Sequence, residues 1–147
     1  MSIANQDEKA VAEVRQVVEA WLEGIHKRDG AAVAALCAPE VLAFDAHSAF
    51  QFRNRDEFEK HLVSCMGQCP PSVTFDLHDI HVEADENLAF SHHLFCARMP
   101  RDGKELVVWT RGTMCLRKVD GEWKVVHGHA SSPYDLESGK AMLELQP

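Results

Sequence analysis

Two Asp-Gly dipeptides, at residues 102–103 and 120–121, constrain the fold of this chain more than any other feature. Each dipeptide separates segments in which apolar and polar residues alternate, and Asp-Gly between such segments is a strong signal for a tight β-hairpin. The sequence therefore predicts three consecutive antiparallel strands, over Leu88–Met99, Lys104–Lys118 and Trp123–Ser132.

The first half of the chain has a helical period instead. Apolar residues recur every three or four positions from Val11 to Ile25, which predicts a long amphipathic helix. A second, Ala-rich helix is expected over Ala31–Cys37. A third is expected to begin at Asn54, because Glu57 follows three residues later as in a capping box.

Three further strands complete the prediction. Val41–Asp45 and Phe50–Arg53 flank a turn, and Val73–Ala84 changes phase near His78-Asp79, which predicts a β-bulge. Helices followed by an antiparallel meander indicate an α+β fold rather than an α/β fold. We expect a conical barrel in which a curved antiparallel sheet wraps around the N-terminal helices.

Size, charge and cysteine content narrow the class of protein. A chain of 147 residues fits one domain. We expect that domain to span residues 1–133, with 134–147 as a loosely held tail. A net charge of −8 argues against nucleic acid as a partner, and no apolar run reaches the ~20 residues of a membrane span. The polar N-terminus and an odd number of cysteines without a repeated CxxC predict free thiols and a cytoplasmic location.

Counting back from two-residue turns gives the register of the strands. His92 then faces Thr113, Leu94 faces Arg111, and Thr113 faces Gly128. One face of the sheet gathers Phe90, His92, Leu94, Trp109, Arg111, Thr113, Cys115, Val126, Gly128 and Ala130. The opposite face gathers Phe95, Val108, Met114, Leu116, Trp123, Val125, His127 and His129.

Both faces are substantially apolar, so both need a cover. Small residues on the first face leave room for a cavity beneath the helices. The second face, with His127 and His129, is expected to pack against another copy of the chain, which predicts a homodimer.

A motif in the last two strands resembles a known family. Arg111-x-Thr113 is followed, from Asp120 to Ser131, by the pattern D-G-x-W-x-x-V-H-x-H-x-S. It is similar to the SnoaL-like, ketosteroid-isomerase-like branch of the nuclear transport factor two-like superfamily. The association domain of calcium/calmodulin-dependent kinase II shares its second half. The resemblance extends from the first helix to Pro133 and implies the conical α+β barrel. The superfamily hosts isomerases, cyclases, dehydratases, hydrolases and binding modules, so the resemblance specifies fold more than function.

Ketosteroid isomerase offers a comparison residue by residue. Aligned on Asp29, its general-base aspartate corresponds to Asp45, its catalytic tyrosine to Trp21, and its second aspartate to a position near Thr113. The resemblance thus keeps the base and replaces both acidic donors by an indole N–H and a hydroxyl. This departure argues against steroid isomerisation itself.

The leading hypothesis is a cofactor-independent enzyme for a small apolar or acidic organic molecule. Asp45 would abstract a proton alpha to a carbonyl, Trp21, Thr113 or His92 would hydrogen-bond the oxyanion, and Arg111 would orient an acidic substrate. Each residue also has a plainer interpretation. Asp45 caps a turn, His92 is a satisfied core histidine, and Arg111 neutralises Asp45.

The remaining candidates are aromatic walls and histidines. The expected pocket walls are Trp21, Phe50, Phe52, Phe90 and Trp109, each of which is otherwise an ordinary core residue. His127 and His129 are secondary candidates, but no third ligand accompanies them, so we expect no metal.

On the third helix, His61, Cys65 and Cys69 have zinc-like spacing. The two cysteines share the apolar face of that helix, which favours buried thiols. The second hypothesis for the whole chain is a non-catalytic ligand-binding or association module that forms a homo-oligomer.

Overall fold

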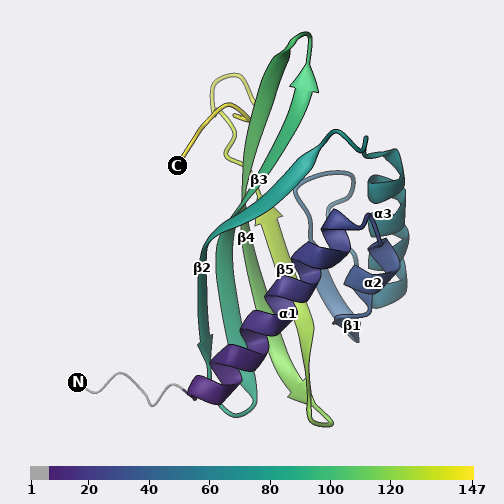
Figure 1. Cartoon of the computed structure of the whole chain (residues 1–147), viewed down its shortest axis with the longest axis vertical. Coiled ribbons are helices and arrows are strands. Elements are labelled where there is room, and N and C mark those ends of the chain that lie inside the picture. The colour runs from purple at the N-terminus through teal and green to yellow at the C-terminus, as the bar shows by residue number, and fades with distance from the viewer. Residues whose placement is uncertain (1–6) are drawn as a thin grey trace, which may run out of the picture.

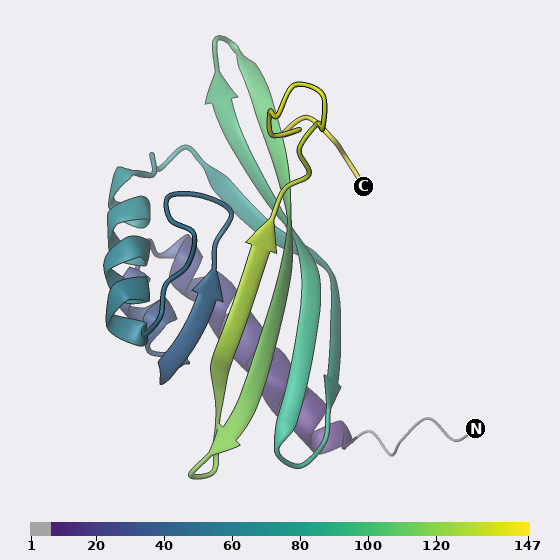
Figure 2. The ribbon, with the colours of Figure 1, turned by 180° about the vertical axis from the view of Figure 1, so that it is seen from behind.

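The computed structural model describes residues 7–147, as helices packed against one sheet (Figure 1). Its elements in chain order are α1 (Glu8–His26), α2 (Gly30–Ala34), β1 (Cys37–Phe44), α3 (Arg55–Gln68), β2 (Thr74–Ala84), β3 (Leu88–Arg101), β4 (Lys104–Val119) and β5 (Glu122–Ser131). Helix α1 lies across one face of the sheet, and within residues 7–147 the opposite face carries no helix (Figure 2). The predicted α+β class is confirmed.

Helix α1 begins where the sequence supplies a cap. The Asp7 side chain accepts hydrogen bonds from the backbone N–H of Lys9 and Ala10, at 3.0 and 3.1 Å, which satisfies donors that the first turn leaves free. Ala10, Val14 and Val18 form its buried stripe. The apolar period therefore becomes a face that packs on the sheet.

Both Asp-Gly hairpins form as predicted. Asp102 and Gly103 have φ of 51° and 74°, and Asp120 and Gly121 have φ of 51° and 82°. Two consecutive positive φ values are typical of the type I′ turn, whose twist matches that of the flanking strands. The β3–β4 pairing follows the predicted count, with His92 opposite Thr113 and Leu94 opposite Arg111.

The sheet is mixed and open, with strand order β1-β5-β4-β3-β2. Strand β1 runs parallel to β5, whereas the meander from β2 to β5 is antiparallel, as expected. The expected strand over residues 50–53 is reduced to a single bridge between Phe52 and Ala43. The second helix ends at Ala34, earlier than expected, so that β1 already begins at Cys37.

Two bulges change the course of the sheet. The one in β2 lies between His78 and His81, where Asp79 has a φ of 52°, and it is the bulge that the sequence predicts. A second bulge interrupts β4–β5 pairing after the Leu116–Val125 pair. Beyond it Thr113 lies opposite His129 rather than Gly128.

The helices cover the sheet face that the sequence analysis assigned to a second copy. Met114, Leu116, Trp123 and Val125 are buried in the core with Val14. The exposed side chains of His92, Arg111, Thr113 and His129 mark the opposite side, which we name the helix-free face. The prediction placed the β3 and β4 side chains on the wrong faces of the sheet. The face expected to line the cavity is the helix-free face, because the larger aliphatic residues of the other face fill the core. The bulge moves His129 to the side of Thr113.

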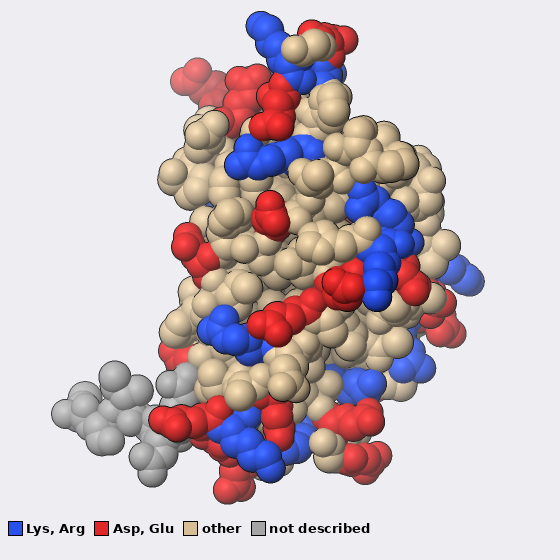
Figure 3. All heavy atoms as spheres, viewed as in Figure 1, with Lys and Arg blue, Asp and Glu red and all other residues tan. Residues whose placement is uncertain are grey.

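Acidic and basic side chains are interspersed on the surface that includes α1 (Figure 3). Within residues 7–147, no helix is long and apolar enough to cross a membrane. After β5 the chain folds back on itself, through a bridge between Tyr134 and Ala141 and a bond from Met142 N–H to the Pro133 carbonyl of 2.7 Å. Residues 1–6, part of the polar N-terminus on which the predicted cytoplasmic location rests, lie outside the described residues.

Candidate functional site

A cavity of about 1090 Å³ lies between the helices and the sheet. Ligand pockets usually measure roughly 300–1,000 Å³, so the space is ample for a small organic molecule. Much of its wall is apolar and comes from α1, α3, the sheet and the segment between β1 and α3. These apolar side chains are Trp21, Ile25, Phe44, Phe52, Leu62, Met66, Phe75, Phe95 and Met114.

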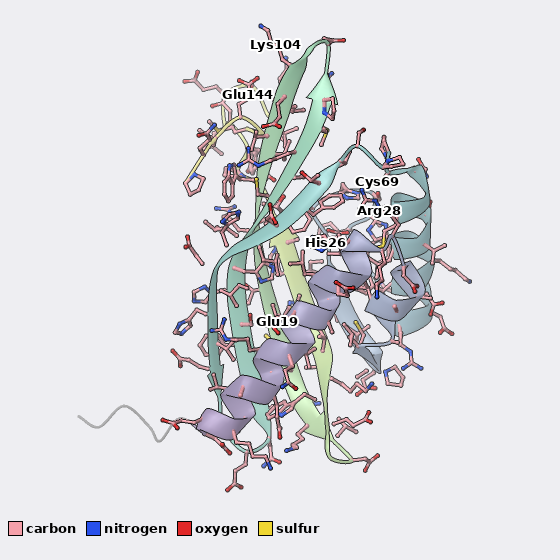
Figure 4. The ribbon with its side chains drawn as sticks, viewed as in Figure 1. Glu19, His26, Arg28, Cys69, Lys104 and Glu144 are labelled. Carbon is pink, nitrogen blue, oxygen red and sulfur yellow. The ribbon has the colours of Figure 1, made fainter. Side chains whose placement is uncertain are left out.

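Arg28, which follows the end of α1, contributes to the cavity wall close to Cys69 at the end of α3 (Figure 4). Its Nη2 donates to the carbonyls of Val73 and Pro70, at 2.6 and 3.3 Å. Its guanidinium carbon lies 4.9 Å from the centre of the Phe75 ring. These contacts of the Arg28 guanidinium join the end of α1 to the segment before β2 and to β2 itself.

Asp45 follows β1 directly and reaches into the same cavity. Its Oδ1 accepts from the backbone N–H of Ala46 at 2.7 Å, which is the local turn contact that the plainer interpretation predicts. Its Oδ2 lies 2.5 Å from His61 Nε2. The carboxylate therefore has both a local partner and a distant one, and it pairs with His61 rather than with Arg111.

Helix α3 holds His61 in one orientation. Asn54 caps the helix by accepting from Glu57 N–H at 2.9 Å, and the Glu57 carboxylate accepts from Arg53 N–H at 2.8 Å. The His61 side chain is only 6% exposed and stacks on Phe52, with ring centres 4.2 Å apart. When Nε2 donates to Asp45, Nδ1 of a neutral ring keeps its lone pair.

Cys65 lies one helical turn after His61, with its Sγ 3.5 Å from His61 Nδ1. Burial raises the pKa of the Cys65 thiol, and the negative charge of Asp45 raises it further, while a hydrogen bond from Ser48 opposes both. At neutral pH the sulfur keeps its proton, so Cys65 is not set up as a thiolate nucleophile.

His93 supplies the sheet side of the cavity. Its ring lies over Gly112, where a Cβ on that residue would collide with the imidazole. The imidazole is buried, and its Nδ1 has no hydrogen-bond partner among the described residues. Burial lowers the pKa of His93, with a smaller contribution from His92, so the ring is neutral at neutral pH. A neutral imidazole with an unused nitrogen can bond a ligand.

The predicted site residues divide into two groups. Those that contribute to the cavity wall are Asp45, Trp21, Phe52, Arg111, Thr113 and His129. The side chains of Arg111 and Thr113 are nevertheless exposed, and Arg111 Nη2 donates to Ser131 Oγ at 3.2 Å. The residues that do not line the cavity are His92, Phe50, Phe90, Trp109 and His127.

The residues outside the wall have other surroundings. Phe50 is 94% exposed in the loop after β1, and Phe90 is exposed near the start of β3. The Trp109 ring lies 5.1 Å from that of His78, and the His127 Nδ1 lies 2.6 Å from the Leu42 carbonyl.

Sequence reasoning missed two residues of the site. His61 was noted only for its spacing to Cys65, because nothing in the sequence indicates that Asp45, sixteen residues earlier, reaches it. His92 and His93 are adjacent in the strand and point to opposite faces of the sheet. Because the predicted face was reversed, His93 and not His92 lies on the cavity side. Gly112, a glycine inside a strand, was the available signal that a neighbouring group approaches closely.

The sequence profile of the SnoaL-like domain matches residues 14–135. The chain belongs to the SnoaL-like domain family. This agrees with the resemblance carried by the motif between Arg111 and Ser131. No protein of curated function matches the chain.

Solved structures place this SnoaL-like domain among NTF2-like folds. An NTF2-like protein of unknown function from Pseudomonas putida KT2440 is 32% identical, with a TM-score of 0.90 over 97% of this chain and 100% of that one. A putative dehydratase of the NTF2-like family from Streptomyces avermitilis is 19% identical, with a TM-score of 0.72 over 85% and 97%. The association domain of CaMKII from C. elegans is 16% identical, with a TM-score of 0.68 over 82% and 94%. The last two show a shared fold.

Proposed function

We propose that this SnoaL-like domain is an enzyme that moves a proton at a carbon next to a carbonyl group, in a small organic substrate bound in the cavity. The observation that carries the proposal is the contact between Asp45 and His61 in the wall of a largely apolar cavity. General bases of this kind need a fixed carboxylate within reach of the substrate. His61 and the Ala46 N–H fix the carboxylate from two sides.

In this proposal Asp45 takes the proton and His61 acts as a positioning residue. The developing oxyanion needs a donor that is already in place. Trp21, through its indole N–H, and His93, through its neutral imidazole, are the donors that we assign to this task. His93 replaces His92 in the role, because His92 is exposed on the helix-free face whereas His93 lines the cavity.

The apolar walls select an apolar substrate. Phe52 is buried beside His61, and Phe95 and Met114 contribute from the sheet. Arg111 contributes to the cavity wall, but its side chain is exposed on the helix-free face and donates to Ser131, so we assign it no part in binding the substrate. Isomerases, cyclases and dehydratases all use a step of this type, and the fold neighbour from Streptomyces avermitilis is called a putative dehydratase.

A thermal-shift screen of the wild type and Asp45→Asn tests for such a substrate. The panel contains apolar acids, phenols, steroids and polyketide-like ketones. A ligand at 100 times its Kd adds about 2.7 kcal/mol to the unfolding free energy, which raises Tm by several degrees. We expect at least one ketone whose shift differs between the two proteins. The same shift in both would show that no ligand contacts the Asp45 carboxylate.

A second candidate function is supported by the helix-free face. Leu88 and Phe90, at the start of β3, are 53% and 40% exposed, which is unusual for large apolar side chains on a strand. We propose that this face joins two copies as a homodimer, and the fold neighbour from C. elegans is an association domain. Saturable ligand binding without turnover, with an oligomer that responds to the ligand, would favour an association module over an enzyme.

A further inference from the structure

The cavity holds a second group of side chains, of which the proposed proton transfer uses only His61, through its Nε2. His47 lies in the loop after β1, while His61 and Cys65 lie one turn apart on α3. One ring nitrogen of each histidine and the Cys65 sulfur all lie within 4.8 Å of one another. Cys65 was expected to be a buried thiol, because its spacing on the helix does not reveal His47 in the loop as a third partner.

We propose that His47, His61 and Cys65 bind a thiophilic divalent cation, with zinc as the expected ion. Two imidazoles and one thiolate are a ligand set that zinc favours, and magnesium and calcium prefer oxygen. Three protein ligands leave one position for water or a ligand molecule, as in an open zinc site.

The separation of two ligand atoms already fits such an ion. Zinc–sulfur and zinc–nitrogen bonds of about 2.3 and 2.05 Å at a tetrahedral angle put the two atoms about 3.6 Å apart. Cys65 Sγ and His61 Nδ1 are 3.5 Å apart. His47 is exposed in its loop, where its Nδ1 lies 2.8 Å from Ser48 Oγ. Closing the remaining distance, on the order of 1 Å, therefore requires a change in this surface contact and not in the core.

The contact between Asp45 and the other ring nitrogen of His61 also fits a metal site. Asp45 contacts His61 Nε2, which leaves Nδ1, the ring nitrogen nearer to Cys65 Sγ, for the ion. Metal-binding histidines usually give their other ring nitrogen to a carboxylate in this way. On binding, the ion takes the place of the thiol proton between sulfur and Nδ1, and that proton leaves to solvent as the metal–sulfur bond forms.

This inference goes beyond the proposed function and does not depend on it. The ion uses Nδ1 of His61 and the sulfur of Cys65, whereas the proposed base is the Asp45 carboxylate. Metal binding is measured without turnover, so either proposal can fail while the other stands.

The test is a metal titration of the reduced, tag-free full chain. Zn²⁺ is titrated in competition with a chromophoric chelator, and Co²⁺ is added separately to observe the thiolate-to-cobalt charge-transfer band. We expect one ion per chain and a charge-transfer band in the wild type. Cys65→Ser should lose the band and bind Zn²⁺ at least about tenfold more weakly, and Asp45→Asn should bind about 10–100-fold more weakly.

Cys69→Ser is the matched control, because Cys69 also lines the cavity one turn further along the chain. It should keep the affinity and the band of the wild type. The proposal is overturned if the wild-type protein does not take Zn²⁺ from the chelator. It is equally overturned by Co²⁺ binding without a charge-transfer band, since the ion then occupies surface histidines of the helix-free face. Because the band is read on the wild type, a variant that fails to fold does not affect this result.

Discussion

Asp45 Oδ2 and His61 Nε2 lie 2.5 Å apart across the cavity wall, although sixteen residues separate them in the chain. The contact joins the end of β1 to the middle of α3 and fixes both side chains. The carboxylate is partly open to the cavity, with 22% of its side chain exposed, whereas the imidazole is buried. The acid is thus the member of the pair that a bound molecule can reach.

We expect His61→Leu to destabilise the fold and Asp45→Asn to leave it nearly unchanged. Leucine leaves the Asp45 carboxylate without its partner, which costs about 1–3 kcal/mol. Asparagine keeps an oxygen that accepts from His61, so its cost should stay below about 1 kcal/mol. Urea unfolding measures both, with exposed His47→Leu as the control. Equal loss in His61→Leu and His47→Leu would contradict a structural role for the pair.

Gly112→Ala should destabilise by about 1–3 kcal/mol, because the new methyl group meets the His93 ring and the buried ring must shift to make room. Gly128→Ala is the control in the neighbouring strand. Its Cβ would meet only the Thr113 carbonyl oxygen at 3.9 Å, an ordinary contact. Thermal unfolding of both variants, and of Gly112→Ala combined with His93→Ala, measures the clash. A Gly112→Ala variant as stable as Gly128→Ala would show that the ring does not lie there.

Stability should fall at acid pH in a way that depends on His93. Burial lowers the pKa of His93 below its ordinary value of 6.5, so the unfolded chain takes up this proton at a higher pH than the folded chain does. The unfolding free energy is therefore lost as the pH falls below 6.5, by at most about 1.4 kcal/mol per pH unit for one group.

His93→Gln should flatten this pH dependence, measured as urea midpoints across the acid range. His92→Gln, on the helix-free face, removes one imidazole as well and should keep the dependence of the wild type. Identical pH profiles in the two variants would argue against a special environment for His93.

If the helix-free face joins two copies, a new charge on this face should separate them. Thr113 is exposed there, opposite His92 and His129, so Thr113→Arg should place two like charges against each other across the interface. Light scattering at micromolar concentration should report a dimer for the wild type and a monomer for the variant. Val63→Arg, at a 50% exposed position on α3, is the control that should stay dimeric. A monomeric wild type would contradict the proposed homodimer.

The meander could be predicted from sequence because its information is local. The Asp-Gly turns require positive φ at residues 102–103 and 120–121, and this sets the hairpins and the pairing of His92 with Thr113. The bulge at His78-Asp79 leaves a phase change in the alternation, so it was visible too.

Other parts of the fold depend on distant contacts. The bulge after Leu116 lies among residues that continue the alternation, so no local signal shows it, and the register of β5 shifts by one. The parallel pairing of β1 with β5 joins two segments that are far apart in the sequence. The choice of sheet face followed from where the large aliphatic side chains pack, which the alternation alone leaves open.

The candidate site was half predictable for the same reason. Asp45 and Trp21 were found through the family resemblance, and both line the cavity. His61 was missed as the partner of Asp45, because its approach depends on how α3 sits against β1. His93 was missed in favour of His92, because adjacent strand residues exchange roles when the face is reversed.

Proton exchange at the bound substrate is the most direct measurement of the central claim. Ketones that shift the Tm of the wild type are incubated with the protein in D₂O, and loss of the proton alpha to the carbonyl is followed by NMR. This detects proton abstraction even when no product is known. The account predicts exchange well above the buffer rate with wild type, and a decrease of about 10²–10⁴-fold with Asp45→Asn. A ketone that binds in the cavity and exchanges equally fast with both proteins, or with neither, would contradict it.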